Sequence, residues 1–267
     1  HAPRIIITTH HKPDADALGS SLALFNYLKN AGIPAQVISP TDYGDFLKWM
    51  PGEETVINFE ETKEHCARLI EEADFVFCLD FNALNRINDM GKMVEKSKAV
   101  KVLIDHHLNP QHFYDFDHWN PESSSTCELM FEVFNEWDPI HIDKHTARCL
   151  YAGIVTDTGS FRFPSTHPST HLVVAELLKF DIEHHHIHES IFDSFTEDRT
   201  RFIGYVISQK LEVLHEFNTA LMCVTQEELA AYNVVTGDTE GLVNYGLSIK
   251  GIKLAAKVHS PDQEPGG

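Results

Sequence analysis

The sequence predicts an α/β fold, in which a parallel β-sheet is covered by helices on both faces and is followed by a smaller α+β unit. Three short and almost wholly apolar runs in the first 104 residues are typical of buried strands. Segments with apolar residues at helical spacing separate these runs. Strands that alternate with helices form βαβ units, whose strands are parallel and buried on both faces.

The elements of the first part follow one another along the chain. Residues 4–9 (RIIITT), 74–79 (DFVFCL) and 100–104 (VKVLI) predict buried strands, and residues 35–39 predict one more. The helical spacing of apolar residues predicts helices at residues 17–31, 60–72, 85–96, 124–137, 145–156 and 168–180.

A smaller second part follows a long helix. The helix is predicted at residues 197–212, and residues 220–224 and 246–256 predict strands of an α+β unit. We therefore expect a first domain at residues 1–196, a helical linker at residues 197–214 and a second domain at residues 215–267.

The charge of the chain limits its partners. Its 267 residues include 21 Lys and Arg against 40 Asp and Glu, a net charge of −19. Non-specific binding to long DNA or RNA depends on basic side chains that neutralise phosphates, so we expect no long duplex as a partner. A small anionic substrate held through bound cations is compatible with this charge.

The chain shows no sign of a membrane segment or a secretory route. No apolar run approaches the roughly 20 residues of a membrane span, and no signal peptide precedes the first predicted strand. The five cysteines are widely spaced, odd in number and without a Cys-x-x-Cys pair. This usage favours buried thiols in a reducing compartment, so we expect a cytoplasmic protein.

Acids and histidines directly follow the three buried strands. The first strand leads into residues 10–16 (HHKPDAD), the second into Asp80 and the third into residues 105–107 (DHH). Asp157 adds an acid at the end of a predicted helix. Because ligands of parallel α/β sheets bind beyond the carboxyl ends of the strands, we expect these groups to converge.

A cluster of carboxylates and imidazoles without thiolates suits Mn²⁺, with Mg²⁺ or Co²⁺ as substitutes. The carboxylates would repel one another unless cations lay between them. Two metal ions roughly 3.5–4 Å apart would hold a phosphate for in-line displacement at phosphorus. The joint pattern therefore favours a two-metal site.

Each acid alone has a simpler interpretation. Asp14 or Asp16 could cap the following helix, Asp80 could be a turn residue, and Asp157 lies in a common Asp-Thr-Gly turn. Such causes do not place acids at successive strand ends, so the metal interpretation is the stronger one.

A denser histidine cluster at residues 184–188 (HHHIH) is interpreted differently. Adjacent residues of a helix point in different directions, and no thiolates or spaced carboxylates accompany these imidazoles. We therefore predict a solvated helix start here.

At these residues the chain resembles the DHH phosphoesterase family, named for the Asp-His-His run found here at residues 105–107. Four motifs occur in the family's order: HHKPDADALGS, CLDFN, IDHHLNP and YAGIVTDTGSFRF. The resemblance covers about residues 4–215. It is strongest to the bacterial nanoRNase/pAp phosphatase group, which degrades very short oligoribonucleotides and removes the 3′-phosphate of adenosine 3′,5′-bisphosphate.

The resemblance implies a fold and a set of metal ligands. The fold is a parallel-sheet DHH catalytic domain joined by a helical linker to a smaller α+β DHH-associated domain, which contributes to substrate binding. Asp80 matches the carboxylate that bridges two Mn²⁺ ions. The remaining ligands divide between the two ions, as His10 and Asp14 for one and Asp16, His106 and Asp157 for the other.

The resemblance also suggests substrate contacts. His107 matches a catalytic residue that faces the scissile phosphate. Residues 121–126 (PESSST) are a helix N-cap, the interpretation that we favour, or a substrate-facing helix N-terminus in which Ser124 and Ser125 bind an anion. Arg162 contacts phosphate or is a surface cation, and Asn82 holds a substrate position or supports a ligand.

These features predict a phosphoesterase. Water between the metals would be acidified to hydroxide and attack phosphorus, while the cations and His107 neutralise the phosphoryl oxygens. Expected substrates are short oligoribonucleotides and adenosine 3′,5′-bisphosphate. A di-adenylate phosphodiesterase or an exopolyphosphatase is the runner-up, and a homodimer is compatible with all of these. The acidic chain disfavours a processive exonuclease, which needs a basic groove.

The C-terminal region departs from the family pattern. Residues 240–256 resemble the start of the second domain, which normally continues to a Gly-Gly-Gly-His motif that grips substrate phosphate. Residues 257–267 (KVHSPDQEPGG) do not match it, and Gly266-Gly267 is at most a fragment of the motif. This departure keeps a second class of function open, that of an inactive nucleotide-binding regulatory protein.

Overall fold

The structure of the protein is a computed structural model that describes residues 2–260. The chain divides between Ile191 and Phe192 into two compact units, which are described separately. No helix within the described residues is long and apolar enough to cross a membrane. Gly266-Gly267, named above for the glycine motif, lies outside these residues.

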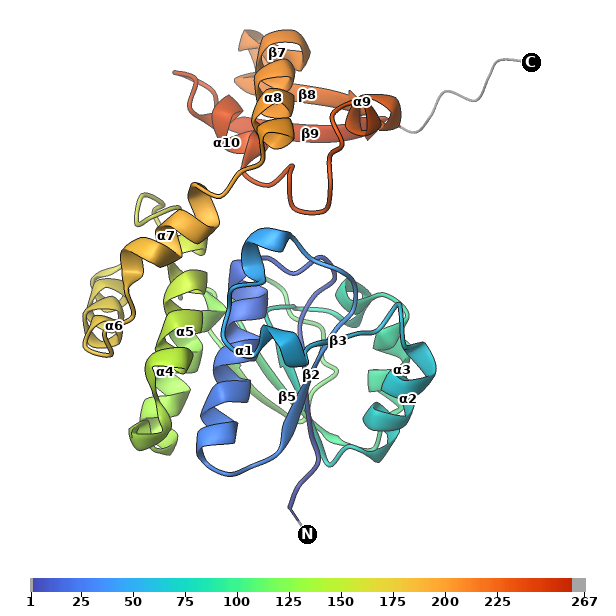
Figure 1. Cartoon of the computed structure of the whole chain (residues 1–267), viewed down its shortest axis with the longest axis vertical. Helices are drawn as coiled ribbons and strands as arrows, with labels where there is room; N and C mark the ends of the chain where they lie inside the picture. The colour runs from blue at the N-terminus through green and yellow to red at the C-terminus, as the bar shows by residue number, and fades with distance from the viewer. Residues whose placement is uncertain (1, 261–267) are drawn as a thin grey trace. The chain divides into compact units, whose positions relative to one another are not determined.

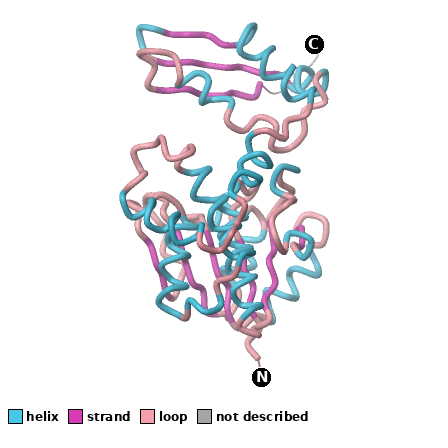
Figure 2. The backbone as a smooth tube through the Cα atoms, turned by 60° about the vertical axis from the view of Figure 1, so that its left-hand side comes forward, coloured by secondary structure: helices cyan, strands magenta, loops and turns pink. Residues whose placement is uncertain are grey.

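The first unit is built on a parallel sheet, as the sequence predicts. Among the described residues this sheet has six strands in the order β3-β2-β1-β4-β5-β6, and every neighbouring pair is parallel. Figure 2 shows the strands in magenta. The strands are β1 (Ile5–Thr8), β2 (Ala35–Ser39), β3 (Ile57–Asn58), β4 (Phe75–Leu79), β5 (Val100–Asp105) and β6 (Phe116–Trp119). The four predicted strands are confirmed, whereas β3 and β6 were not predicted.

The direction in which strands are added reverses between β1 and β4. From β1 the chain adds β2 and β3 on one side, and it then returns to add β4, β5 and β6 on the other side. Such a reversal is where ligands bind in open α/β sheets, beyond the carboxyl ends of the strands. The carboxyl ends of β1 and β4 are therefore the expected place for a site.

Helices cover both faces of this sheet (Figure 1). On one face α1 (Ala15–Asn30), α4 (Thr126–Trp137) and α5 (Lys144–Asp157) pack against one another. On the other face α2 (Lys63–Glu72) and α3 (Met90–Lys96) pack together. The helices α6 (Pro168–Leu178) and α7 (His184–Phe192) follow.

Most predicted helices are confirmed apart from their ends, and one is wrong in its first half. Residues 85–96 do not form a single helix. A 3₁₀ turn at Leu84–Ile87 precedes α3, because Asn88 adopts a left-handed backbone with φ of 51° and interrupts the helical path.

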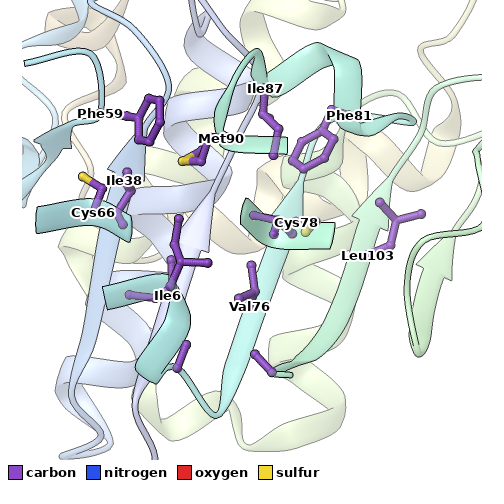
Figure 3. Close-up of a cluster of buried hydrophobic side chains, with 14 residues drawn as sticks. Ile6, Ile38, Phe59, Cys66, Val76, Cys78, Phe81, Ile87, Met90 and Leu103 are labelled. Atoms are coloured by element: carbon purple, nitrogen blue, oxygen red, sulfur yellow. The ribbon is translucent and has the colours of Figure 1, made fainter. Parts of the chain in front are cut away.

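The core between the sheet and α2 and α3 consists of alternate strand residues (Figure 3). Ile6 of β1, Val76 and Cys78 of β4 and Met90 of α3 lie together there, and Ile70 of α2 belongs to the same buried cluster. Each of these side chains is at least 96% buried, and an aliphatic side chain contributes about 1.5–3 kcal/mol on leaving water. This packing holds the strand ends in fixed positions.

Helices α1 and α5 approach each other closely at glycines. A Cβ atom on Gly153 would lie 2.3 Å from Cys127 Sγ and 2.6 Å from Asp16 Oδ1. A Cβ atom on Gly19 would lie 2.7 Å from the carbonyl oxygen of Cys149. Glycine at these positions therefore lets α5 lie against α1, which brings the end of α5 to the start of α1.

The second unit contains a smaller sheet. Within the described residues its strands are β7 (Leu211–Leu214), β8 (Thr219–Thr225) and β9 (Leu254–Ser260), with β8 in the centre, antiparallel to β7 and parallel to β9. Its helices are α8 (Glu197–Tyr205), α9 (Gln226–Ala231) and α10 (Leu242–Leu247).

Two predictions in this unit are wrong in part. The helix expected at residues 197–212, and with it the helical linker to residue 214, gives way after one π-helical turn to β7. The strand expected at residues 246–256 begins only at Leu254, because residues 242–247 form α10. Leu242 and Gly246 of α10 are buried, and a Cβ atom on Gly246 would lie 3.0 Å from Ala220 Cβ of β8, so apolar residues that resemble a strand are the inner face of a helix.

Candidate metal centre

Four separate segments meet at the carboxyl ends of β1, β4 and β5. They are the loop from β1 into α1, the residue after β4, the residues after β5 and the end of α5. Together they form three groups whose potential ligand atoms lie within 4.8 Å of one another. These groups contain all six residues expected to bind metal, which are His10, Asp14, Asp16, Asp80, His106 and Asp157.

One group consists of His10, Asp14 and Asp80. His10 Nε2 lies 3.8 Å from Asp14 Oδ2 and 3.5 Å from Asp80 Oδ2. The other oxygen of Asp14 caps α1 and accepts hydrogen bonds of 3.0 Å from the backbone N–H groups of Asp16 and Ala17. The capping interpretation of Asp14 is therefore confirmed, and it leaves Oδ2 free to face His10.

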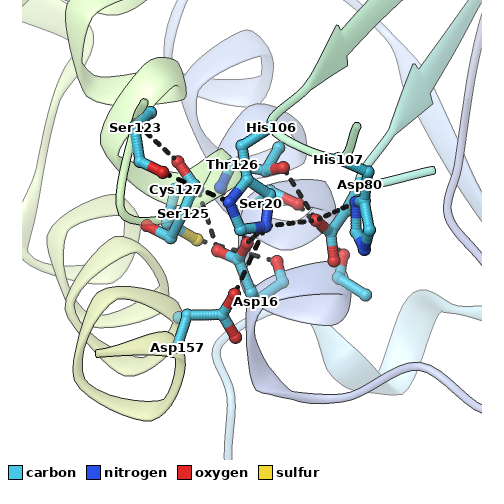
Figure 4. A network of polar contacts seen from close by, with 12 residues as sticks. Asp16, Ser20, Asp80, His106, His107, Ser123, Ser125, Thr126, Cys127 and Asp157 are labelled. Carbon is cyan, nitrogen blue, oxygen red and sulfur yellow. Dashed lines mark hydrogen bonds and ion pairs between the residues drawn. The ribbon is translucent and has the colours of Figure 1, made fainter. Parts of the chain in front are cut away.

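A second group consists of Asp16, His106 and Asp157 (Figure 4). His106 Nε2 lies 3.8 Å from Asp16 Oδ2 and 3.3 Å from Asp157 Oδ2. It also lies 3.5 Å from Asp80 Oδ1. Asp80 therefore turns one carboxylate oxygen toward each group, which is the geometry of a bridging ligand.

The backbone of Asp80 contributes to this placement. Asp80 directly follows β4 and has a φ of 63°, in the left-handed region. This conformation costs a residue with a side chain about 1–2 kcal/mol. The site therefore contains local strain at the residue that faces both groups.

Backbone carbonyls orient the two imidazoles. Nδ1 of His10 lies 2.9 Å from the carbonyl oxygen of His11, and Nδ1 of His106 lies 3.3 Å from that of Ser123. A carbonyl oxygen can only accept, so Nδ1 carries the proton in each bond. Nε2 of each ring is then directed at the carboxylates, as in metal-binding histidines.

The N-terminus of α4 holds the carboxylates in place. Asp16 accepts hydrogen bonds from the backbone N–H groups of Thr126, at 2.7 Å, and Cys127, at 2.9 Å. The hydroxyl of Thr126 donates to Asp80 Oδ1 at 2.8 Å. A helix N-terminus favours an anion, and here the anion is a buried carboxylate of the chain itself. The sequence pattern of residues 121–126 predicts this N-terminus, but not the contacts of Thr126 and Cys127 with the two carboxylates.

The charges of the cluster fit divalent cations. Burial, together with the carboxylates of Asp80 and Asp157, raises the pKa of Asp16. Burial also raises the pKa of Asp157 to about 6. Burial opposes the charged forms of His10 and His106, yet the surrounding carboxylates raise the pKa of His10 to about 11 and that of His106 to about 10. A cluster this rich in carboxylate and imidazole donors is suited to bind divalent metal.

His107 belongs to the third group, together with Asp80 and His106. Its Nδ1 is 2.7 Å from Asp105 Oδ1 and 3.7 Å from Asp80 Oδ1. Its side chain is 30% exposed, whereas that of Asp105 is fully buried. Asp105 therefore fixes the ring of a histidine that solvent and ligands can reach, a role that sequence reasoning did not assign to Asp105.

The other residues predicted to contact the substrate form hydrogen bonds within the chain. Ser124 is buried and its hydroxyl donates to Glu128, and Ser125 is the buried N-cap of α4 and accepts from the Glu128 N–H at 3.0 Å. The N-cap interpretation of this segment is thus confirmed. Asn82 Nδ2 donates to the Leu108 carbonyl at 2.7 Å, and the exposed Arg162 donates from Nε to the Gly159 carbonyl at 2.6 Å. As substrate contacts these four residues stay predictions.

The histidine run at residues 184–188 opens α7. His184, His185 and His186 are exposed, and no group of potential metal ligands within residues 2–260 includes them. His188 Nε2 lies 3.0 Å from the hydroxyl of Tyr151. The predicted solvated helix start is confirmed for the first three histidines.

Comparisons with known proteins agree with this geometry. The probable bifunctional oligoribonuclease and PAP phosphatase NrnA of Streptococcus mutans serotype c is 29% identical over 241 residues, which are 90% of this chain and 72% of that protein. A probable manganese-dependent inorganic pyrophosphatase of Streptococcus pyogenes serotype M5 is 28% identical over 189 residues, which are 65% of this chain and 54% of that protein.

A solved structure is also similar. The crystal structure of an exopolyphosphatase-related protein from Bacteroides fragilis matches with a TM-score of 0.89 and 40% identity, over 94% of this chain and 74% of that chain. The predicted resemblance to the oligoribonuclease and pAp phosphatase group is confirmed by the first of these relatives. Residues 4–154, more than half of the chain, match the N-terminal domain of the DHH family, so the chain belongs to the DHH family.

Proposed function

We propose that this chain hydrolyses phosphoester bonds in short oligoribonucleotides and in adenosine 3′,5′-bisphosphate, with two Mn²⁺ ions in the carboxylate–imidazole cluster. The position of Asp80 carries the proposal. Its two oxygens lie 3.5 Å from His10 Nε2 and 3.5 Å from His106 Nε2, so one carboxylate faces two groups of ligands. Two adjacent metal sites of this kind are typical of phosphoryl-transfer enzymes.

The names of the relatives support the substrates and the metal. The Streptococcus mutans protein is named for oligoribonuclease and PAP phosphatase activity, and the Streptococcus pyogenes protein for manganese-dependent pyrophosphate hydrolysis. Short nucleotides also suit a chain with a net charge of −19, because its metal ions rather than its surface would attract the phosphate.

The ligands divide between the two ions. His10 and Asp14 would hold one ion, Asp16, His106 and Asp157 the other, and Asp80 both. When bound, the two cations supply positive charge to the phosphoryl oxygens and lower the pKa of water. The hydrogen bonds from α4 to Asp16 and Asp80 keep these carboxylates in place before the ions arrive.

His107 would act on the substrate. The buried carboxylate of Asp105 accepts from its Nδ1, which leaves Nε2 for a phosphoryl or leaving-group oxygen. From this position Nε2 can face an oxygen on which negative charge develops. Its exposed fraction of 30% is consistent with access to a ligand.

Polyphosphate is the second candidate substrate. It is favoured by the 40% identity to the exopolyphosphatase-related protein of Bacteroides fragilis. Polyphosphate has no base or sugar, so its hydrolysis would need the metal ligands and His107 but no contact to a nucleoside.

The test is a metal-dependent assay on the full chain. The chain is stripped with a chelator and resupplied with Mn²⁺, and product is measured from pApA, adenosine 3′,5′-bisphosphate, cyclic di-AMP and polyphosphate. We expect turnover of the first two and a loss of at least about 1,000-fold in Asp80→Asn, because both metal sites lose a negative ligand. Asp89→Asn, which alters a carboxylate whose side chain is 67% exposed, is the matched control.

Two outcomes contradict the proposal. Undiminished phosphate release in Asp80→Asn would mean that the cluster is not the active site. Tight binding of nucleotide by the wild-type chain without turnover of any of the four substrates, at saturating Mn²⁺, would favour the regulatory function.

A further inference from the structure

An indole is hydrogen-bonded to the backbone of the catalytic histidine. Trp119 Nε1 donates to the carbonyl oxygen of His107 at 2.7 Å. Trp119 is the last residue of β6, and its partner in the neighbouring strand is Asp105, the residue that fixes the His107 ring. Trp119 therefore lies at the same carboxyl edge of the sheet as the metal cluster, next to His107.

The indole is held by its N–H edge and remains open to solvent. Trp119 is 38% exposed, so more than a third of its surface is open to solvent. Because Nε1 is hydrogen-bonded to the His107 carbonyl, a ligand can contact the indole only through the apolar remainder of its ring system. The structure thus presents an apolar surface directly beside the residue expected to face the phosphate.

The backbone of the loop that follows β5 is held at the next residue as well. Leu108 follows His107 and is 68% exposed, while its carbonyl oxygen accepts a 2.7 Å hydrogen bond from Asn82 Nδ2. The backbone N–H of Gln111 in turn donates to the Asn82 carbonyl at 2.7 Å. Two side chains near the ends of different strands, Asn82 after β4 and Trp119 at the end of β6, therefore hold the backbone at residues 107 and 108.

We propose that Trp119 is the surface on which the nucleobase next to the scissile phosphate stacks. This inference rests on the proposed function and names the part of the substrate that the metal ligands do not contact. An indole stacks on any base, because every base has a π-face. Such a surface suits an enzyme for short oligonucleotides of varied sequence, and it would distinguish nucleotides from polyphosphate.

Trp119 has a second role that can be separated from the first. Its N–H holds the His107 backbone, whereas its ring area serves stacking. Trp119→Phe keeps an aromatic ring and removes the N–H donor, and Trp119→Ala removes both. Phe116 is the matched control, because it lies on the same strand, is 66% exposed and pairs with Val102, away from the carboxyl edge.

The experiment compares a nucleotide with a base-free ester. Hydrolysis of adenosine 3′,5′-bisphosphate and of ribose 3,5-bisphosphate is measured with the Mn²⁺-loaded full chain and its three variants. Stacking of one base changes binding by about five- to a hundredfold. We expect Trp119→Ala to lower the ratio of kcat/KM for the nucleotide to that for the base-free ester by about tenfold or more, mainly through KM. Trp119→Phe should keep most of this ratio, and Phe116→Ala should not change it.

An unchanged ratio in Trp119→Ala, or an equal loss on both substrates, would overturn the inference, because the indole would then serve only the His107 backbone. A change of oligomeric state in Trp119→Ala at constant ratio would instead assign this surface to a second copy of the chain. Binding of adenosine 3′,5′-bisphosphate, followed by quenching of tryptophan fluorescence, tests stacking without turnover. If the wild-type chain binds nucleotide with quenching that Trp119→Phe abolishes but hydrolyses nothing, the stacking surface stands and the proposed function fails.

Discussion

The carboxylate of Asp16 accepts a 2.7 Å hydrogen bond from the backbone N–H of Thr126, 110 residues further along the chain. Asp16 lies in the first turn of α1 and Thr126 is the first residue of α4. The contact joins the start of two helices on the same face of the sheet. It places the positive end of α4 against the most buried acid of the candidate metal centre.

Thr126→Val should weaken metal binding more than it weakens the fold. Valine has nearly the shape of threonine but cannot donate to Asp80 Oδ1, which now lies 2.8 Å from the Thr126 hydroxyl. Loss of such a supporting hydrogen bond typically costs ten- to a hundredfold in metal affinity. The Mn²⁺ dissociation constant, measured by titration with detection of free Mn²⁺, should rise by that factor.

Thr126→Ser is the control, because serine keeps the hydroxyl. It should bind Mn²⁺ within about threefold of the wild-type chain. Equal Mn²⁺ affinity in the valine and serine variants would show that the hydroxyl does not support Asp80.

The predicted part of the site depends on strands that can be recognised locally. β1, β4 and the second half of β5 are buried, so each strand contains an apolar run, and the acids and histidines that follow it are easily found. β6 was missed because its residues, FDHW, are mostly exposed at the edge of the sheet. Because β6 was not predicted, the position of Trp119 at the edge of the sheet was not predicted either.

The remaining features depend on contacts between distant residues. That Asp80 faces both groups requires β4 to lie between β1 and β5 and its own backbone to be left-handed, neither of which the residue spacing contains. Thr126 could be placed near a helix start, but its contact with Asp16 depends on how α4 packs on α1. Local patterns therefore predicted which acids and histidines converge, and tertiary packing determined the residues that position them.

Gly153→Ala should destabilise the first unit. The new Cβ atom would lie 2.3 Å from Cys127 Sγ and 2.6 Å from Asp16 Oδ1, closer than atoms can approach. Overpacking of this kind costs about 1–3 kcal/mol. To relieve the contact with the new Cβ atom, Asp16 would have to move. Urea denaturation should show a lower free energy of unfolding, and Mn²⁺ titration should show weaker binding.

Gly204→Ala is the control for Gly153→Ala. It lies in α8, and no atom within 4 Å would meet its Cβ atom. Alanine is favoured over glycine in a helix by about 0.8–1 kcal/mol, so this variant should be at least as stable as the wild-type chain. Equal destabilisation by both substitutions would rule out the close contact of α5 with α1 as the cause.

Of the five thiols, only that of Cys223 should react quickly in the native chain. Cys66, Cys78, Cys127 and Cys149 are buried free thiols, and Cys223 is exposed. Burial raises the pKa of Cys78 to about 12 and also raises those of the other three buried thiols, which disfavours the reactive thiolate. A thiol-disulfide reagent should therefore modify one group in buffer and five in denaturant.

Cys223→Ser should remove the fast reaction of the native chain and leave four groups in denaturant. Rapid modification of more than one thiol in the native wild-type chain would mean that a buried cysteine becomes exposed by opening of the first unit.

Metal loading should release protons and strengthen with pH. In the metal-free chain the carboxylates raise the pKa of His10 to about 11 and that of His106 to about 10, against the effect of burial, so both rings are protonated at neutral pH. Metal binding needs the free Nε2 lone pair and displaces these protons. Between pH 6 and 8 the Mn²⁺ dissociation constant should fall by about tenfold per pH unit for each proton released.

The stability of the metal-free chain should decrease with rising pH, whereas its affinity for Mn²⁺ should increase. Because the folded pKa of each histidine lies above the ordinary value of 6.5, their ion pairs stabilise the fold fully below about pH 6.5, and this contribution is lost as the pH rises through 10 to 11. Chelator-treated protein should therefore lose stability in alkali earlier than Mn²⁺-loaded protein.

The protons released on metal binding are measured by calorimetric titration of Mn²⁺ in buffers of different ionisation enthalpy. The His106→Gln variant should release about one proton fewer than the wild-type chain. An Mn²⁺ affinity that is constant from pH 6 to 8, with no buffer dependence of the heat, would show that these imidazoles are not displaced by the metal.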